Sequence, residues 1–202
     1  MNKVAIVDSG MCNLHSIARA VEEVGGSSEI CETPDGLRVA NRIVLPGVGA
    51  FGEAMQNLRD RGMDDAIREQ AEQGIPVLGV CLGMQLLMTT GTEGGLHQGL
   101  GLIQGDVQLL KPTNGERVPH MGWNEVNLTR ESPLVGQVES GSDFYFVHSY
   151  EVRCADPDDV VATTPYCGGF TSVIERDNVL GFQFHPEKSQ ARGLRLLELF
   201  VA

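Results

Sequence analysis

The sequence has no apolar run near the roughly 20 residues that a membrane-spanning helix needs. Its N-terminus enters a strand-like segment at Lys3 without the pattern of a signal peptide. The 5 cysteines are odd in number and lack the C-x-x-C spacing that is typical of zinc sites. These absences predict a cytoplasmic protein in a reducing compartment, with no membrane association, no disulfide framework and no structural metal.

Positive charge is also scarce in this chain. Its 15 lysines and arginines stand against 27 aspartates and glutamates, which gives a formal net charge of −12. Such a surface repels polyphosphate, so the composition argues against nucleic acid as a partner. A solvated acidic surface explains this charge, and a basic protein partner would also suit it.

Strand-like and helix-like segments alternate in the first half. Apolar runs at 3–8, 28–31, 41–47 and 75–80 predict strands, and helical spacing is found at 13–24 and at 51–73, with a break near Gly62. This order predicts an α/β fold with an open, mostly parallel sheet flanked by helices.

The second half contains strand candidates that are close together and separated by turn residues. They are followed by a helix at 190–201. The candidates lie at 106–110, 123–128, 144–152, 160–164, 170–175 and 179–184. They predict an added antiparallel portion, and because no linker composition interrupts the chain, we expect a single domain over residues 1–202.

A lone cysteine, Cys81, lies at a tight corner between the fourth strand and a helix-like run, with Gly79 and Gly83 as its second neighbours. A sharp strand-to-helix turn at the carboxyl edge of a sheet exposes its central side chain, as in the nucleophile elbow. The N–H groups of the following helix favour a thiolate. This pentapeptide alone fits both a packed small hydrophobe and a nucleophile.

Two other segments offer partners for such a nucleophile. His185 ends the 179–184 strand, and Glu187 is close enough in sequence to orient its ring and stabilise its cation. The segment Pro46-Gly47-Val48-Gly49 ends another strand, and a peptide N–H there could hold a developing oxyanion. Taken alone, the second segment is better explained as an ordinary glycine-rich turn.

Together, the segments 79–85, 46–49 and 184–187 resemble the class I, or triad-type, glutamine amidotransferases, in the order found in that family. The resemblance implies Cys81 as nucleophile, His185 as base and Glu187 as the orienting group. It implies an oxyanion hole formed by the N–H of Leu82 and a backbone N–H near Val48 and Gly49. No metal or organic cofactor is implied.

The same resemblance implies L-glutamine as the substrate. It would be held by Gln85, Glu93, Ser149 and Tyr150, with backbone contacts from Gly49. Gln85 is also supported by spacing, because it follows Cys81 by four residues, about one helical turn. The roles of the other residues rest on the resemblance alone.

Two further strings, 118–126 (VPHMGWNEV) and 144–152 (FYFVHSYEV), are similar to the glutaminase subunits of imidazole glycerol phosphate synthases. This implies a heterodimer with a TIM-barrel cyclase subunit, to which ammonia passes to make imidazole glycerol phosphate and AICAR in histidine biosynthesis. Met121, Trp123 and Asn124 would lie at the partner interface, with Lys188 close by. Alternatively, Trp123 is a core residue and His120 lies in a loop.

Three functional alternatives remain at this point. The chain could serve a different synthase, be a non-catalytic regulatory subunit, or be a cysteine peptidase or related thiol hydrolase. The loop at 8–13 (DSGMCN) departs from a common family pattern, which leaves its contacts open. The cysteines other than Cys81 are expected to be buried and inert: Cys12, Cys31, Cys154 and Cys167.

Overall fold

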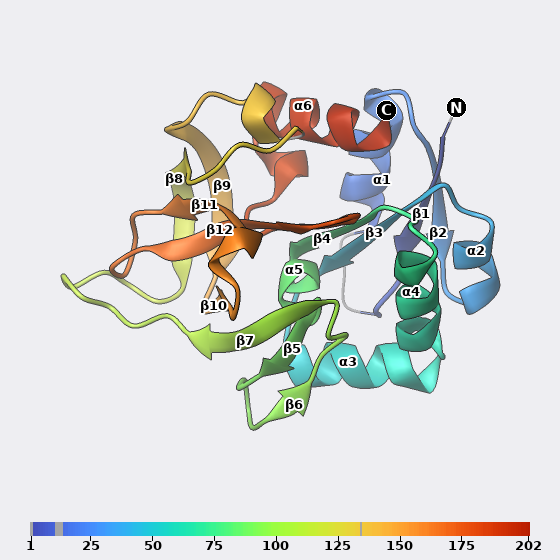
Figure 1. Ribbon diagram of the computed structural model, residues 1–202, viewed down its shortest axis with the longest axis horizontal. Coiled ribbons are helices and arrows are strands. Elements are labelled where there is room, and N and C mark those ends of the chain that lie inside the picture. The colour runs from blue at the N-terminus through green and yellow to red at the C-terminus, as the bar shows by residue number, and fades with distance from the viewer. Residues whose placement is uncertain (1, 11–13, 134) are drawn as a thin grey trace.

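The computed structural model describes residues 2–10, 14–133 and 135–202 (Figure 1). Cys12 and the variable part of the 8–13 loop, 11–13, lie outside the described residues, so the predictions about them stay predictions. Within the described ranges, no helix combines the length and apolar character needed to cross a membrane.

A parallel section of the sheet is formed by strands from both ends of the chain. In spatial order these strands are β2 (Ser27–Cys31), β1 (Lys3–Val7), β3 (Arg42–Gly47), β4 (Val77–Cys81) and β13 (Val179–Phe182). Because they run in one direction, the carboxyl ends of β3, β4 and β13 meet at one edge. Gly47 of β3 lies opposite Cys81 of β4 in the register.

An antiparallel portion continues the sheet from β13. It consists of β12 (Phe170–Arg176), β10 (Tyr150–Cys154), β7 (Ile103–Leu109), β5 (Met88–Gly91) and β6 (His97–Gln98), with β11 (Val160–Thr164), β8 (His120–Leu128) and β9 (Ser142–His148) branching from β12. The exception to the antiparallel pairing is β5 with β7, which run parallel. The branch carries β8 and β9 past the end of the parallel section, where β9 lines one side of the site described below (Figure 1).

Helices cover both faces of the parallel section and produce two apolar cores. The helices α1 (Leu14–Glu23) and α6 (Gln190–Val201) pack on one face, and α2 (Pro34–Arg38), α3 (Phe51–Asp60), α4 (Met63–Glu72) and α5 (Leu82–Leu86) contribute to the core on the other. Short 3₁₀ turns are found at Val135–Gln137, Pro157–Asp159 and Pro186–Lys188. Since burial of each large apolar side chain contributes about 1.5–3 kcal/mol, the two cores fix the sheet edge that carries the site.

The fold confirms the predicted α/β class, and most predicted elements lie within a few residues of their expected bounds. Gly62 adopts the left-handed conformation (φ 65°) and separates α3 from α4, as the expected break required. The predicted strand 144–152 is divided at Ser149 into β9 and β10.

The helix after Cys81 is shorter than the apolar run following it suggests. It ends at Leu86, and β5 begins at Met88. The N–H of Leu100 donates to the carbonyl of Leu86, and that of Leu102 donates to the carbonyl of Leu87. These carbonyls therefore bond to a distant segment instead of continuing a helix, so tertiary hydrogen bonds override the local preference.

Candidate active site

The corner at Cys81 has the backbone conformation of a nucleophile elbow. Cys81 has φ 55° and ψ −112°, a conformation that costs a non-glycine residue roughly 1–3 kcal/mol. A Cβ on Gly79 would lie 2.6 Å from the carbonyl oxygen of Gly83, and a Cβ on Gly83 would lie 1.7 Å from that of Leu45. The two glycines therefore allow both the tight turn and the close approach of α5 to β3.

His185 and Glu187 form a buried hydrogen-bonded pair just beyond β13. His185 Nδ1 and Glu187 Oε1 are 2.9 Å apart, and their side chains are 5% and 8% exposed. The backbone N–H of His185 donates to the carbonyl of Tyr145 on β9. The Ser189 hydroxyl donates to the carbonyl of His185 and accepts from the N–H of Tyr145. These contacts fix the direction of the imidazole ring.

The pKa of His185 is raised to about 9 by its two neighbours. Burial by itself lowers this pKa, but interactions with the Cys81 sulfur and the Glu187 carboxylate outweigh burial. Within the described part of the chain, the second ring nitrogen, Nε2, is buried and has no hydrogen-bond partner. With Nδ1 engaged by Glu187, Nε2 is the atom left to exchange a proton with Cys81.

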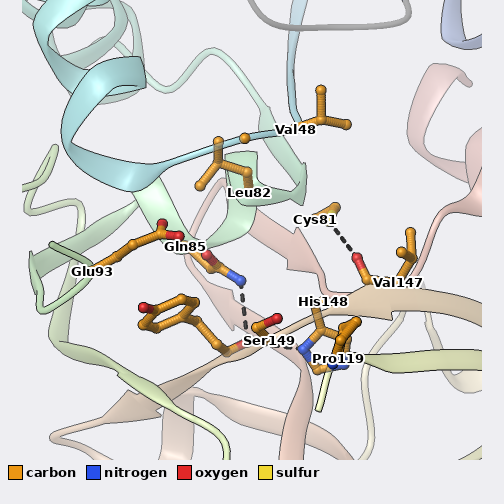
Figure 2. A pocket seen from close by; sticks show the side chains of 11 residues that line it. Val48, Cys81, Leu82, Gln85, Glu93, Pro119, Val147, His148 and Ser149 are labelled. Carbon is orange, nitrogen blue, oxygen red and sulfur yellow. Dashed lines mark hydrogen bonds between the residues drawn. The ribbon is translucent and has the colours of Figure 1, made fainter.

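A cavity of about 270 Å³ opens beside Cys81. Its volume is at the low end for ligand sites and suits a molecule the size of an amino acid. Figure 2 shows Cys81 between Val48, on the loop after β3, and Val147, on β9. The other lining residues are Gly49, Leu82, Gln85, Glu93, Pro119, His148, Ser149 and Tyr150.

All the residues predicted to hold the substrate or the oxyanion therefore line one cavity. Val48 and Gly49 are exposed at its rim, and Gly49 adopts φ +94°, which suits glycine. Glu93 reaches across to accept a hydrogen bond from the N–H of Phe51, at the start of α3, at 2.8 Å. The Gln85 Nε2 donates to the carbonyl of Tyr150 at 3.2 Å. Their contacts with glutamine stay predictions.

Two buried residues at the site were not predicted, Gln183 and His148. Gln183 Nε2 lies 3.8 Å from Cys81 Sγ, and His148 lines the cavity. One signal in the sequence points to Gln183, because alternate residues of a strand share a face and Gln183 precedes His185 by two positions. His148 had no such local signal.

His148 belongs to a chain of hydrogen bonds that ends at Asn124. His148 Nδ1 is 2.8 Å from the carbonyl of Tyr150, which can only accept, so Nδ1 carries the proton. The neutral His148 Nε2 then accepts from His120 Nδ1 at 3.0 Å, and His120 Nε2 accepts from Asn124 Nδ2 at 3.2 Å. Burial lowers the pKa of His120 to about 4 and is the main cause that lowers that of His148 to about 3. Both rings are therefore neutral at pH 7.

The outer face of the β8–β9 ribbon carries the residues predicted for the partner interface. Met121 and Trp123 are 64% and 48% exposed, and the Trp123 ring packs edge-on against Tyr145. Lys188 Nζ lies 5.8 Å from the centre of the Tyr145 ring. The alternative placing Trp123 in the core and His120 in a loop is wrong. Asn124 differs from the other interface candidates, because it faces inward to His120.

The remaining described cysteines are free thiols outside the site. Cys31 is buried, as expected, whereas Cys154 and Cys167 are only half-buried. Desolvation is the main cause that raises the pKa of all three thiols, that of Cys154 to about 12. The expectation that they are inert is therefore supported by their weak acidity, although two of them are less buried than expected.

Acid should destabilise this protein through the two neutral histidines. In the unfolded chain each binds a proton near pH 6.5, whereas in the folded chain His120 does so only near pH 4 and His148 near pH 3. The unfolding free energy should therefore fall as pH drops from about 6.5 to 4, by up to about 1.4 kcal/mol per pH unit for each proton. Urea unfolding across this range measures the slope. His120→Gln should reduce the slope of the unfolding free energy against pH by the contribution of about one proton. The matched change at the exposed His15 should leave this slope unchanged.

A match to a family model now places the fold and site in a known class. The model described as glutamine amidotransferase class-I matches residues 5–202. The chain therefore belongs to the class-I glutamine amidotransferases.

Relatives and solved structures agree with this placement. Imidazole glycerol phosphate synthase subunit HisH 2 of Nitrobacter winogradskyi is 47% identical, over 100% of this chain and 98% of the relative. Subunit HisH of Moorella thermoacetica is 46% identical, over 99% and 94%. The structure of PurLQS from Thermotoga maritima superposes with a TM-score of 0.78 at 20% identity, covering 99% of this chain and 98% of that one. At this identity, the superposition demonstrates a shared fold.

Proposed function

We propose that residues 1–202 form one glutaminase domain, which hydrolyses L-glutamine to glutamate and ammonia and passes the ammonia to a cyclase subunit of imidazole glycerol phosphate synthase. One observation carries the chemical part. Cys81 and the hydrogen-bonded pair of His185 and Glu187 meet at the carboxyl ends of two adjacent parallel strands, beside a cavity of amino-acid size.

In the first half of the reaction, Cys81 attacks the side-chain amide carbon of glutamine. The raised pKa of His185 favours transfer of the Sγ proton to Nε2 before the attack, and the carboxylate of Glu187 holds Nδ1–H and stabilises the imidazolium. The new carbon–sulfur bond converts the carbonyl oxygen to an oxyanion. Backbone N–H groups of Leu82, and of Val48 or Gly49 on the other side of the cavity, bind this oxyanion.

In the second half, the tetrahedral intermediate collapses and the carbon–nitrogen bond breaks. The amide nitrogen leaves as ammonia after receiving the proton from His185. A water molecule then gives a proton to His185 and attacks the glutamyl thioester, which releases glutamate and returns the proton to the Cys81 sulfur. The balance is one glutamine and one water consumed for one glutamate and one ammonia.

The substrate is held in the cavity beside Cys81. Gln85, Ser149 and Tyr150 supply polar groups there, and Glu93 supplies a carboxylate suited to the α-ammonium group of an amino acid. This arrangement favours free glutamine over a peptide, because a peptide-bonded glutamine has no α-ammonium group. That difference is evidence against the thiol peptidase alternative.

The choice of partner rests on the relatives and on the outer face of the β8–β9 ribbon. Those two relatives carry the name of imidazole glycerol phosphate synthase subunits. Exposed Met121 and Trp123, with Tyr145 and Lys188 beside them, form an aromatic surface typical of an interface core. This surface adjoins His185 through the Tyr145 backbone, so ammonia released at Cys81 is formed close to the partner.

The same surface gives a test of the partner. Trp123→Ala should weaken binding to the cyclase subunit about 30-fold, because a central tryptophan typically contributes 2 kcal/mol or more. Leu96→Ala is the matched control, since Leu96 is 74% exposed at the turn between β5 and β6, away from β8. Calorimetric titration of both variants measures the difference. Equal affinities, or co-purification with a non-cyclase synthase, would argue for one of the alternatives.

A further inference from the structure

Gln183 contacts both the nucleophile and a proposed substrate-binding residue. Its side chain is fully buried, with 0% exposure. Its Nε2 lies 3.8 Å from Cys81 Sγ, and its Oε1 accepts a hydrogen bond from Gln85 Nε2 at 3.1 Å. The described residues place no other side-chain amide within hydrogen-bonding distance of this sulfur.

The hydrogen-bond pattern fixes the orientation of both amides. Gln85 Nε2 faces two acceptors, the carbonyl of Tyr150 and Oε1 of Gln183, so it uses both of its hydrogens inside the protein. The Gln85 Oε1 is then the end left for a ligand in the cavity that Gln85 lines. With its own Oε1 engaged by Gln85, Gln183 must turn its N–H₂ group toward Cys81.

The register of the sheet explains why position 183 has this place. Phe182 lies opposite Val80 in the parallel pair of β13 and β4, so the next residues, Gln183 and Cys81, are neighbours across the strands. Neighbours in register point to the same face of a sheet. A side chain at 183 is therefore held beside the elbow, which agrees with the 3.8 Å between Gln183 Nε2 and Cys81 Sγ.

We propose that Gln183 is a positioning residue of the glutaminase reaction, which orients the Cys81 sulfur through its N–H₂ group and the substrate-facing end of Gln85 through its carbonyl. Only the second part of this inference, the orientation of Gln85 toward the substrate, rests on the proposed function. An N–H donor stabilises a sulfur that carries negative charge more than it stabilises a neutral thiol. Gln183 thus acts on the reactive state of Cys81 without touching the substrate.

The test compares two variants that separate the two contacts. Gln183→Met removes both the donor and the acceptor at nearly constant length, whereas Gln183→Glu keeps an acceptor for Gln85 and removes the donor. Alkylation of Cys81 by iodoacetamide in the full chain, followed by mass spectrometry of its peptide, gives a pH profile for the reactive sulfur. Both variants should move its midpoint upward by about one pH unit, which slows alkylation about tenfold below the midpoint.

The KM for glutamine measures the second contact, which joins the Gln183 carbonyl to Gln85. Gln183→Met should raise KM several-fold, whereas Gln183→Glu should leave KM nearer to that of the parent protein. Gln70→Met is the matched control, because Gln70 is a buried glutamine of α4 outside the site, and it should change neither measurement.

The outcomes distinguish this inference from the proposed function. The positioning role is overturned if the midpoint of the Cys81 alkylation profile does not move in a folded Gln183→Met protein. If the Met variant does not fold, the same result in Gln183→Glu overturns it. The alkylation measurement does not require glutamine, because iodoacetamide reacts with the Cys81 sulfur itself. Absence of glutamine hydrolysis by the parent protein would overturn the proposed function, while the alkylation profile would still decide the role of Gln183.

Discussion

Replacing Cys81 by alanine should lower glutamine-dependent synthesis by the complex with the cyclase by about 10⁴- to 10⁶-fold, the usual loss when a catalytic nucleophile is removed. The thioester cannot form without Sγ, and the remaining groups can only polarise the amide. Synthesis from added ammonium salt should be retained, because it needs only the cyclase. Side-by-side assays with the two nitrogen sources measure both effects.

Two comparisons make this result specific. Cys154→Ala removes a half-buried thiol away from the cavity and should leave both activities unchanged. A Cys81→Ala protein that still used glutamine would show that the nucleophile had been assigned wrongly. Loss of the ammonium-dependent synthesis as well would show that the substitution disturbs the cyclase itself, and the loss with glutamine would then not identify Cys81 as the nucleophile.

The second large effect concerns the glycine that follows the nucleophile by two positions. Gly83→Ala would place a Cβ 1.7 Å from the carbonyl oxygen of Leu45, in the middle of β3. A backbone atom cannot be displaced as a flexible side chain can, so α5 and β3 must separate. We expect a loss of more than about 3 kcal/mol in the free energy of unfolding, or failure to fold.

Gly136→Ala is a suitable control for this substitution. Gly136 also lies in a short helical turn, but a Cβ there would meet no atom of the described residues within 4 Å. Its effect on stability should stay within about 0.5 kcal/mol. Denaturant unfolding of both variants measures the difference. Similar stabilities would show that the corner around Cys81 tolerates a side chain and that its glycines have another purpose.

The arrangement of Cys81, His185 and Glu187 could be predicted from the sequence, because each of these residues carries a local signal. Cys81 and His185 each end an apolar strand, and strands of this kind place their carboxyl ends at one sheet edge. The short interval between His185 and Glu187 already allowed a hydrogen bond, which the structure contains. Parallel pairing of β4 with β13 brings together residues that are about a hundred positions apart.

The features that were not predicted depend on contacts between distant segments. The early end of α5 is due to backbone hydrogen bonds from Leu100 and Leu102, which no local pattern reveals. The pairing of His120 with His148 follows from their opposition in the register of β8 and β9. The inward direction of Asn124 follows from the alternation of side chains along β8 and could have been read from the sequence once that strand was known to start at His120.

The most direct test of Cys81 as a glutamine-specific nucleophile is affinity labelling with a diazoketone analogue of glutamine. The full chain, with the cyclase subunit present, is treated with the analogue, digested and examined by mass spectrometry. We predict modification of the peptide that contains Cys81, protection by added glutamine, and no modification in Cys81→Ala. Labelling of Cys31, Cys154 or Cys167 in place of Cys81, or no labelling with the partner present, would contradict a glutaminase.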